Sequence, residues 1–442
     1  MKVAQFNTFP YGGAATAAKR IHEKLRAKNI DSQFFYHRNE KAEIQEPSFH
    51  QLNFSSPKFG IFTGAVQRRR ERRRQKDVYD QFNTHLALRP AGQETFSMAQ
   101  LPESTPLDWK SIDADVLHLH WISFFADYPS FFDSVPNDTP IVWTLHDMNA
   151  FTGGCHYSNG CSRFRFGCGG CPQVVNSSPK DVSATTFNVK QQSLQNKNLH
   201  IVTPSDWMRE LAMDSKVFPT QASFQTIRLG FDLKTFQPIN KSDARRALGL
   251  DTDAILIGFG AEDINNRRKG LQHLLPALEN LNTKNKVESL VFGSGEIESS
   301  ANQPKVNHFG YVDSEQKQAL IYSAADLVVV PSREDNQPQV GLEAMACGTP
   351  VVAFDAGGIP EYVRDGQTGL IAKLGDEAHL AERISALVDN AEARATMGRR
   401  ARLMMEREFD SNRQSERYLD LYRLVSSKKS VAGPAARRRQ AA

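Results

Sequence analysis

Short apolar runs alternate with longer amphipathic segments along most of this chain. The runs occupy residues 3–6, 33–36, 116–120, 141–145 and 201–203 in the first half, and residues 255–259, 289–292, 327–330 and 351–354 in the second. Apolar runs of this length, each followed by a segment long enough for a helix, are typical of parallel sheets covered by helices on both faces. The alternation therefore predicts an α/β fold.

The chain is too long for a single hydrophobic core. Its 442 residues exceed the roughly 250–300 at which one core usually stops growing. Residues 219–238 begin and end with proline, contain Gly230 and lack helical periodicity, which indicates a hinge. We expect a first Rossmann-like domain at residues 1–230 and a second at residues 231–405, facing each other across a ligand-binding cleft.

Several segments depart from the alternating pattern. Residues 41–106 are polar and basic and include QRRRERRRQK, and residues 152–172 are rich in glycine and cysteine. We expect both to be insertions on the first domain. Residues 406–425 are expected to form a helix that packs back toward the first domain. Residues 426–442 are basic and aperiodic, so we expect a disordered tail.

The basic runs and the lack of long apolar segments bear on the partners and the cellular location of the protein. Arginine runs bind the phosphates of anionic lipids or nucleic acids, and the alternative is a solvated helix face or a disordered end. Aromatic residues are not interleaved with these arginines, which makes nucleic acid an unlikely partner. The sequence shows neither a signal-peptide pattern nor the roughly 18 consecutive apolar residues that span a bilayer. We expect a cytoplasmic protein, either free or at the inner face of the membrane.

Two turns carry residue types that suit an anion. Gly12 and Gly13 lie between an apolar run and a helix-like segment. Glycine lets the backbone approach a ligand closely, and a helix N-terminus presents unpaired N–H groups and partial positive charge. An ordinary strand-to-helix turn is the alternative. Arg267, Arg268 and Lys269 follow another apolar run, and they can neutralise a diphosphate as its charge develops.

Residues 332–354, SREDNQPQVGLEAMACGTPVVAF, contain the most informative pattern. An apolar run leads into an acidic loop that contains Asp335, and then into an expected helix that carries Glu343. Loops that follow strands hold ligands in this class of fold. Because the two carboxylates are eight positions apart, both can face one crevice, where they accept hydrogen bonds from hydroxyl groups.

Four of the five cysteines lie in one loop, GGCHYSNGCSRFRFGCGGCP. They are Cys155, Cys161, Cys168 and Cys171. Four thiolates satisfy the tetrahedral preference of zinc, although only the last pair has the common CxxC spacing. A closed structural zinc site is one interpretation, and free or redox-active thiols are the other.

Taken in order, the motifs resemble those of the retaining family-four, or group-one, glycosyltransferases, which have the two-domain GT-B fold. The resemblance covers most of the chain. Besides the glycine turn and the acidic segment, it rests on DVLHLHW, WTLHD, TPSDWMRE, RLGFDLKTFQP, RRKG, HFGYV, ADLVVVPS and GGIPEYVRDGQTGLI.

The resemblance implies a role for each candidate residue. Glu343 is expected to bind the ribose, Arg268 and Lys269 the diphosphate, and Asp335 the hydroxyls of the transferred sugar. His146, after the run at 141–145, is expected to contact the donor sugar near the reacting centre. Gly12, Gly13 and the backbone of Gln339 and Val340 complete the expected donor site.

Two positions depart from the family pattern. Counting eight positions back from Glu343 reaches Asp335 and leaves Glu334, the more familiar residue type, one place out of register. Pro338 stands where the family usually has glycine, and proline has no N–H to offer a ligand.

By this resemblance the protein transfers a sugar, with retention of configuration, from a nucleotide-diphosphate sugar to a hydroxyl of a glycan or lipid-linked acceptor. Polysaccharide or cell-envelope synthesis is the expected setting, and the reaction requires no catalytic metal because the leaving diphosphate can take the acceptor proton. The alternatives are a nucleotide-sugar epimerase or hydrolase of the same fold, or a nucleic-acid-binding protein that uses the arginine-rich segment and the cysteines.

Overall fold

A computed structural model describes residues 1–37, 44–52, 65–90, 93–101, 112–297 and 303–431. The contacts divide the chain into two compact units. Unit 1 comprises Met1–Pro204, Met208–Ile227 and Ser415–Ala442, and unit 2 comprises Ser205–Trp207 and Arg228–Gln414. The division therefore falls inside the segment expected to be the hinge, three residues before the expected boundary.

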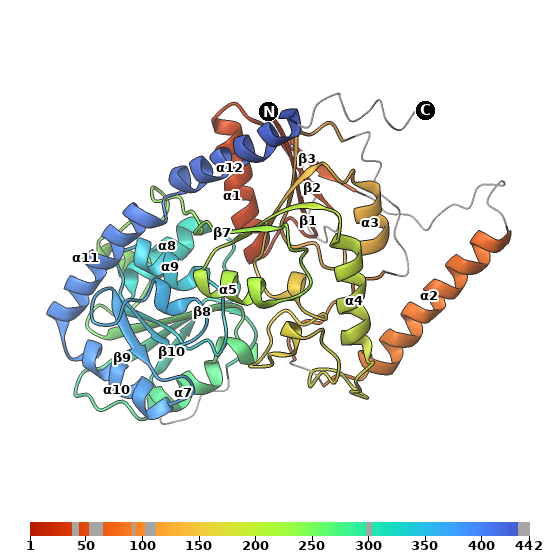
Figure 1. Cartoon of the computed structure of the whole chain (residues 1–442). Helices are drawn as coiled ribbons and strands as arrows, with labels where there is room; N and C mark the ends of the chain where they lie inside the picture. Colours follow the sequence, from red (N-terminus) through yellow and green to blue (C-terminus); the bar gives the residue numbers. More distant parts are fainter. Residues whose placement is uncertain (38–43, 53–64, 91–92, 102–111, 298–302, 432–442) are drawn as a thin grey trace. The chain divides into compact units, whose positions relative to one another are not determined.

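Unit 1 is built on a parallel sheet of seven strands (Figure 1). Their order is β3-β2-β1-β4-β5-β6-β7. The direction of the order reverses between β1 and β4, and the carboxyl ends of strands at such a switch point form a natural ligand site. The bounds are β1 Lys2–Asn7, β2 Asp31–Tyr36, β3 Phe49–Gln51, β4 Val116–Leu119, β5 Pro140–Thr144, β6 Asn198–Thr203 and β7 Ser223–Thr226.

Unit 2 contains a second parallel sheet, of six strands. Its order, β10-β9-β8-β11-β12-β13, has the same topology, with the switch point between β8 and β11. The bounds are β8 Ile255–Asp263, β9 Val287–Ser294, β10 Lys305–His308, β11 Leu327–Val330, β12 Val351–Phe354 and β13 Gly369–Ala372. The prediction of an α/β fold with two parallel sheets is confirmed.

Helices cover both faces of the first sheet. Val3, Val116 and Val142 point from the strands into a core shared with α1 and with Tyr418 and Tyr422 of α12. On the opposite face α3 packs through aromatic rings onto β1 and β5. The helices of unit 1 are α1 Gly13–Ala27, α2 Ala65–His85, α3 Tyr128–Ser134, η2 Asn149–Phe151, η3 Arg163–Arg165, α4 Val182–Leu194, and α5 Asp206–Asp214 and α12 Ser411–Val431, both of which start in unit 2.

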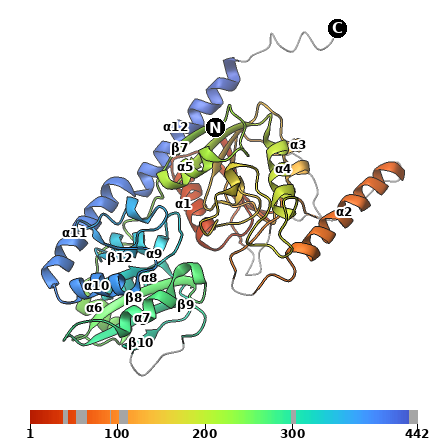
Figure 2. The same ribbon diagram turned by 60° about the horizontal axis from the view of Figure 1, so that its bottom comes forward.

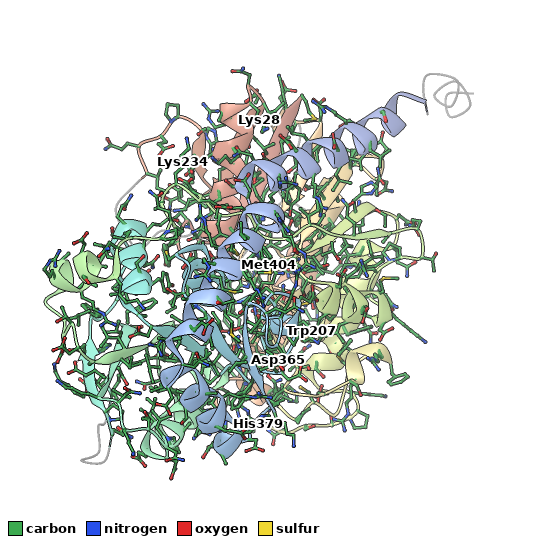
Figure 3. The ribbon with its side chains drawn as sticks, turned by 90° about the vertical axis from the view of Figure 1, so that its left-hand side faces the viewer. Lys28, Trp207, Lys234, Asp365, His379 and Met404 are labelled. Carbon is green, nitrogen blue, oxygen red and sulfur yellow. The ribbon has the colours of Figure 1, made fainter. Side chains whose placement is uncertain are left out.

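In unit 2 the helices form two groups. One contains α7 and α10, and the other contains α6, α8, α9 and α11 (Figure 2). Figure 3 marks His379 in the first turn of α10 and Met404 on α11, where the methionine is buried. The bounds are α6 Lys241–Leu248, η4 Arg267–Lys269, α7 Leu271–Glu279, α8 Glu315–Ala324, α9 Gln339–Ala346, η5 Ile359–Glu361, α10 Glu377–Val388 and α11 Ala391–Glu408.

Some local expectations need correction. The segment expected to be a hinge contains β7, which pairs with β6 along the edge of the sheet. The helix expected at 406–425 is two helices, because α11 ends at Glu408 and α12 begins at Ser411. The expectation of disorder from Ser426 is wrong as far as Val431, because α12 continues to that residue. Residues 432–442 lie outside the described part of the chain.

Candidate functional site

The switch point of the second sheet is closed by two loops that approach very tightly. After β8 the chain turns into η4, where the side chain of Asn266 accepts a hydrogen bond from Arg268 N at 2.9 Å. Gly270 follows with φ +83°, and a Cβ there would lie 1.8 Å from the carbonyl oxygen of Pro331. Only glycine fits this position. As a result, the basic turn lies directly against the loop after β11.

This close approach brings three of the predicted site residues together. Asp335 Oδ2 accepts hydrogen bonds from Arg268 Nη1 at 2.8 Å and from Lys269 Nζ at 2.7 Å. The Asp335 side chain is 6% exposed, compared with 13% for Arg268 and 24% for Lys269. A half-exposed pair would contribute little, but charges shielded to this degree interact strongly. Two cations face one carboxylate, so the cluster has one positive charge in excess and suits an anionic ligand.

The backbone on both sides of Asp335 is also fixed. Gly358 N donates to the Asp335 carbonyl oxygen at 2.9 Å. Gly357 has φ +60°, and a Cβ there would lie 1.9 Å from the same oxygen. The loop after β12 thus holds the position of Asp335, a constraint that the eight-residue spacing alone did not indicate.

Glu343 lies on α9, the helix that follows the Asp335 loop. Its Oε2 accepts a hydrogen bond from the hydroxyl of Tyr322 at 2.9 Å, and both side chains are buried. Tyr322 comes from α8 and was missed from the sequence, where a tyrosine on a helix gives no sign of its partner. The bond orients the carboxylate, which remains an acceptor for ribose hydroxyls.

The first turn of α9 carries the remaining residues predicted for unit 2. Pro338 occupies the N-cap position, without a side-chain cap, and Gln339 and Val340 follow it. The first N–H groups of a helix have no intrahelical acceptor, and the helix dipole favours an anion there. The expected contacts of the Gln339 and Val340 backbone with a diphosphate stay predictions.

Gly12, Gly13 and His146 belong to unit 1 and lie at the carboxyl edge of its sheet. Gly12 adopts φ +85° and is the N-cap of α1, which begins at Gly13. His146 follows β5, and its Nε2 lies 3.2 Å from Nδ1 of His120. Burial lowers the pKa of His146 to about 4, although Asp147 opposes the shift. The imidazole is therefore neutral near pH 7, and its role in sugar binding stays a prediction.

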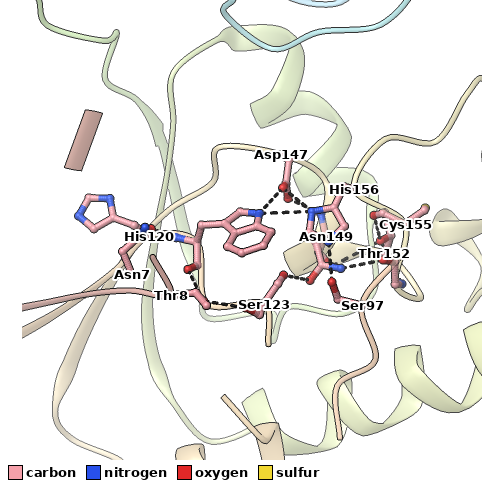
Figure 4. A network of polar contacts seen from close by, with 12 residues as sticks. Asn7, Thr8, Ser97, His120, Ser123, Asp147, Asn149, Thr152, Cys155 and His156 are labelled. Atoms are coloured by element: carbon pink, nitrogen blue, oxygen red, sulfur yellow. Dashed lines mark hydrogen bonds and ion pairs between the residues drawn. The ribbon is translucent and has the colours of Figure 1, made fainter. Parts of the chain in front are cut away.

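Asp147 joins this edge to the cysteine-rich loop (Figure 4). Its Oδ2 accepts hydrogen bonds from Trp121 Nε1 at 2.7 Å and from His156 Nδ1 at 2.6 Å, while Oδ1 accepts from Asn149 N at 2.8 Å. Burial opposes ionisation, but His156 and these hydrogen bonds hold the pKa of Asp147 below its ordinary value. The sequence placed His156 beside Cys155 without indicating this pairing, which fixes the loop next to His146.

The four loop cysteines line one small cavity with Phe96, Arg163 and Phe164. Its volume of about 20 Å³ is enough for one water or one ion. Burial raises the pKa of Cys168 to about 12 and raises those of Cys155 and Cys171. Within the residues described, no three His, Cys, Asp or Glu side chains are placed to hold a metal ion together. The fit to zinc is therefore partial, and the zinc site stays a prediction.

Comparison with protein families matches residues 255–390 to "Glycosyl transferases group 1". The D-inositol 3-phosphate glycosyltransferase of Saccharomonospora viridis is 33% identical over 220 residues, which are 45% of this chain and 49% of that protein. The putative colanic acid biosynthesis glycosyl transferase WcaC of Escherichia coli is 25% identical over 367 residues, or 80% of this chain and 83% of WcaC. The chain thus spans about half the length of the inositol-phosphate relatives that it matches.

Solved structures share the fold across nearly the whole chain. Sucrose-phosphate synthase from Thermosynechococcus elongatus has a TM-score of 0.67 at 18% identity, covering 97% of this chain and 99% of its own. Anabaena HepE, solved in complex with UDP and glucose, has a TM-score of 0.64 at 16% identity, covering 95% and 99%. The fold is GT-B, as predicted.

Proposed function

We propose that this chain, whose residues 255–390 match the group 1 glycosyltransferases and whose fold is GT-B, transfers a sugar from a nucleotide-diphosphate sugar to a hydroxyl acceptor with retention of configuration. The observation that carries the proposal is the cluster of Arg268, Lys269 and Asp335 at the switch point of the second sheet. Its excess positive charge suits a diphosphate, and the Glu343 carboxylate, which accepts from Tyr322, has further capacity to accept hydrogen bonds from a ribose.

The chemistry follows from the charges of this cluster. As the bond between the anomeric carbon and the diphosphate breaks, negative charge grows on the leaving group, where Arg268 and Lys269 stabilise it. The acceptor oxygen forms the new bond on the same face of the sugar, and its proton passes to the diphosphate. Asp335 holds both cations in place and accepts from a sugar hydroxyl. This route uses no catalytic metal.

The acceptor proposed is a glycan or a lipid-linked sugar of the cell envelope. The likeness to WcaC, a putative colanic acid biosynthesis enzyme, supports a polysaccharide setting. HepE has been solved in complex with UDP and glucose and with UDP-glucose, which supports a nucleotide-sugar donor for the present chain.

Helix α2 supports an anionic membrane surface as a further partner. Its inner face carries Arg74, whose Nη1 lies 3.1 Å from Asp127 Oδ1, and the buried Val78. Arg69, Arg72 and Lys76 are exposed on the face turned away from these anchors. Tyr79, at 49% exposure, adds an aromatic ring of the kind found at membrane interfaces. Among the described residues, every helix is too short or too polar to cross a bilayer.

The transfer reaction is tested by a donor screen followed by product analysis. Nucleotide sugars are first ranked by thermal stabilisation, because a ligand that binds only the native state raises its apparent stability. Lys269→Ala is expected to lower transfer by about 100-fold. Lys286→Ala is the matched control, because Lys286 also pairs with an aspartate in unit 2 but is exposed. Nucleotide release without a glycosylated product, or formation of an epimer, contradicts the proposal.

Membrane binding is tested with vesicles that contain anionic phosphatidylserine. Replacing Arg69, Arg72 and Lys76 together by glutamine is expected to lower vesicle affinity roughly 100-fold, since each cation contributes about 1 kcal/mol. The control replaces three exposed cations of unit 2 by glutamine: Lys373, Arg399 and Arg400. Equal binding to neutral vesicles, or preferential binding to duplex DNA, contradicts the membrane role.

A further inference from the structure

A line of polar side chains crosses the first sheet and ends at His146. Gln5 on β1 lies in register with His118 on β4, and His120 follows two positions later on the same face. Gln5 Oε1 lies 3.0 Å from His120 Nε2, and His120 Nδ1 lies 3.2 Å from His146 Nε2. Gln5 and His120 are buried, so water does not compete for these contacts.

The hydrogen bonds in this line have a direction. A neutral imidazole has one N–H donor and one lone pair. The amide oxygen of Gln5 only accepts, so His120 carries its proton on Nε2 and presents a lone pair at Nδ1. His146 must then donate from its own Nε2. Both rings are neutral near pH 7, because burial lowers the pKa of each.

The other end of the line fixes the orientation of Gln5. Its Nε2 donates to Ser32 Oγ at 2.8 Å. Ser32 Oγ lies 2.8 Å from His22 Nδ1, and His22 Nε2 lies 3.1 Å from Ser48 Oγ. If Ser32 donates to His22 and His22 donates to Ser48, every group has a partner and the whole line runs in one direction. Bonds aligned in this way strengthen one another.

We propose that Gln5 and His120 are positioning residues that hold His146 in the Nε2–H tautomer. Nδ1 is then the ring nitrogen that accepts, so a group that meets it has to donate. The step to substrate rests on the proposed function: a hydroxyl of the transferred sugar donates to His146 Nδ1. An acceptor-only group at that place, such as the carboxylate of a uronic acid, meets a lone pair and is disfavoured.

The tautomer is measured directly on the ¹⁵N-labelled full chain by two-bond proton–nitrogen NMR of the histidine rings. The resonances of His146 are assigned from their loss in His146→Gln. We expect the Nε2–H pattern for both His120 and His146 at pH 7. An Nδ1–H pattern at His146 overturns the inference. The NMR measurement needs no turnover, so its outcome does not depend on transferase activity.

Gln5→Met tests the connection, because methionine has a similar length and makes no comparable hydrogen bond. We expect His146 to show a mixture of tautomers and kcat to fall about tenfold with little change in KM for the donor. Gln33→Met is the matched control: Gln33 Oε1 also bonds a histidine, His50 Nε2 at 2.7 Å, toward the edge of the same sheet. Unchanged His146 signals in Gln5→Met contradict the proposal.

Gln5→Glu keeps an acceptor in the same place and serves if the methionine variant does not fold. It is expected to retain the Nε2–H tautomer and most of the activity, whereas loss of that tautomer contradicts the proposal. Transfer is also compared between a nucleoside-diphosphate hexose and the corresponding uronate. Preference for the uronate overturns the hydroxyl contact, and an inactive protein with the expected tautomer refutes only the proposed function.

Discussion

Asp335→Asn gives a sharp test of the charge cluster, because it removes one charge and almost no volume. In the native protein Asp335 is the common partner of Arg268 and Lys269. Asparagine can still accept hydrogen bonds, so the variant isolates the electrostatic part of the interaction. It removes the negative charge that Arg268 and Lys269 share.

The structure sets the size of the effect. Removing one partner of a fully buried ion pair costs about 3–5 kcal/mol. Lys269, at 24% side-chain exposure, keeps part of its hydration, so we expect a loss of about 2–3 kcal/mol in the free energy of unfolding. For a unit of this size the midpoint of thermal unfolding then falls by roughly 5–10 °C.

Added UDP is expected to reduce the difference in stability between the variant and the native protein. The excess positive charge of the site rises from one to two, so UDP stabilises Asp335→Asn more than the native protein. Transfer nevertheless falls by about 100-fold, because the cations and the sugar hydroxyl lose their common partner. Differential scanning calorimetry with and without UDP measures the first effect, and product formation measures the second.

Asp251→Asn is the control, since Asp251 pairs with Lys286 at the surface of the same unit. It is expected to leave the unfolding midpoint, the response to UDP and the activity unchanged. An Asp335→Asn protein that unfolds and turns over like the native one refutes the reasoning. So does a variant that is destabilised but no more responsive to UDP.

Three further predictions concern other parts of the molecule. Tyr322→Phe removes the hydrogen bond to Glu343 and is expected to weaken nucleotide binding by about five- to tenfold in calorimetric titration; an unchanged affinity contradicts its orienting role. If the cysteine cavity holds zinc, elemental analysis gives about one zinc per chain, retained in Cys347→Ser and lost in Cys171→Ser; four freely titratable loop thiols without zinc contradict the site. Burial lowers the pKa values of His22 and His146 to about 4, so between roughly pH 6.5 and pH 4 the unfolded chain binds protons that the native chain does not. Urea unfolding is therefore expected to show stability falling as pH drops through this window, by up to about 1.4 kcal/mol per pH unit for each histidine; equal stability at pH 7 and pH 5 contradicts their neutral burial.

Local sequence patterns determined the elements of this fold well. The apolar run at 327–330 is β11, and the run at 351–354 is β12. A strand buried on both faces must be apolar throughout, so its signal is contained in a few consecutive residues. The spacing of Asp335 and Glu343 was equally local, because it needed only a loop followed by a helix.

Edge and connecting elements were harder to predict. β7 was missed, since at the edge of the sheet only one side needs a partner and none of its residues is fully buried. The arginine-rich segment did not show whether it forms a helix, as α2 does, because a basic helix and a basic loop share the same composition. In both cases tertiary contacts, rather than a residue pattern, stabilise the element.

The sequence by itself determined which side chains were available for a donor site, and the tertiary structure decided which of them meet. Arg268 and Asp335 are 67 positions apart, and they touch because β8 and β11 are neighbours at the switch point. The pairing of Tyr322 with Glu343, and that of His156 with Asp147, likewise depends on packing between elements. A linear pattern records residue types and spacing, whereas the order of strands in a sheet is set by the burial of whole surfaces, which no short segment encodes.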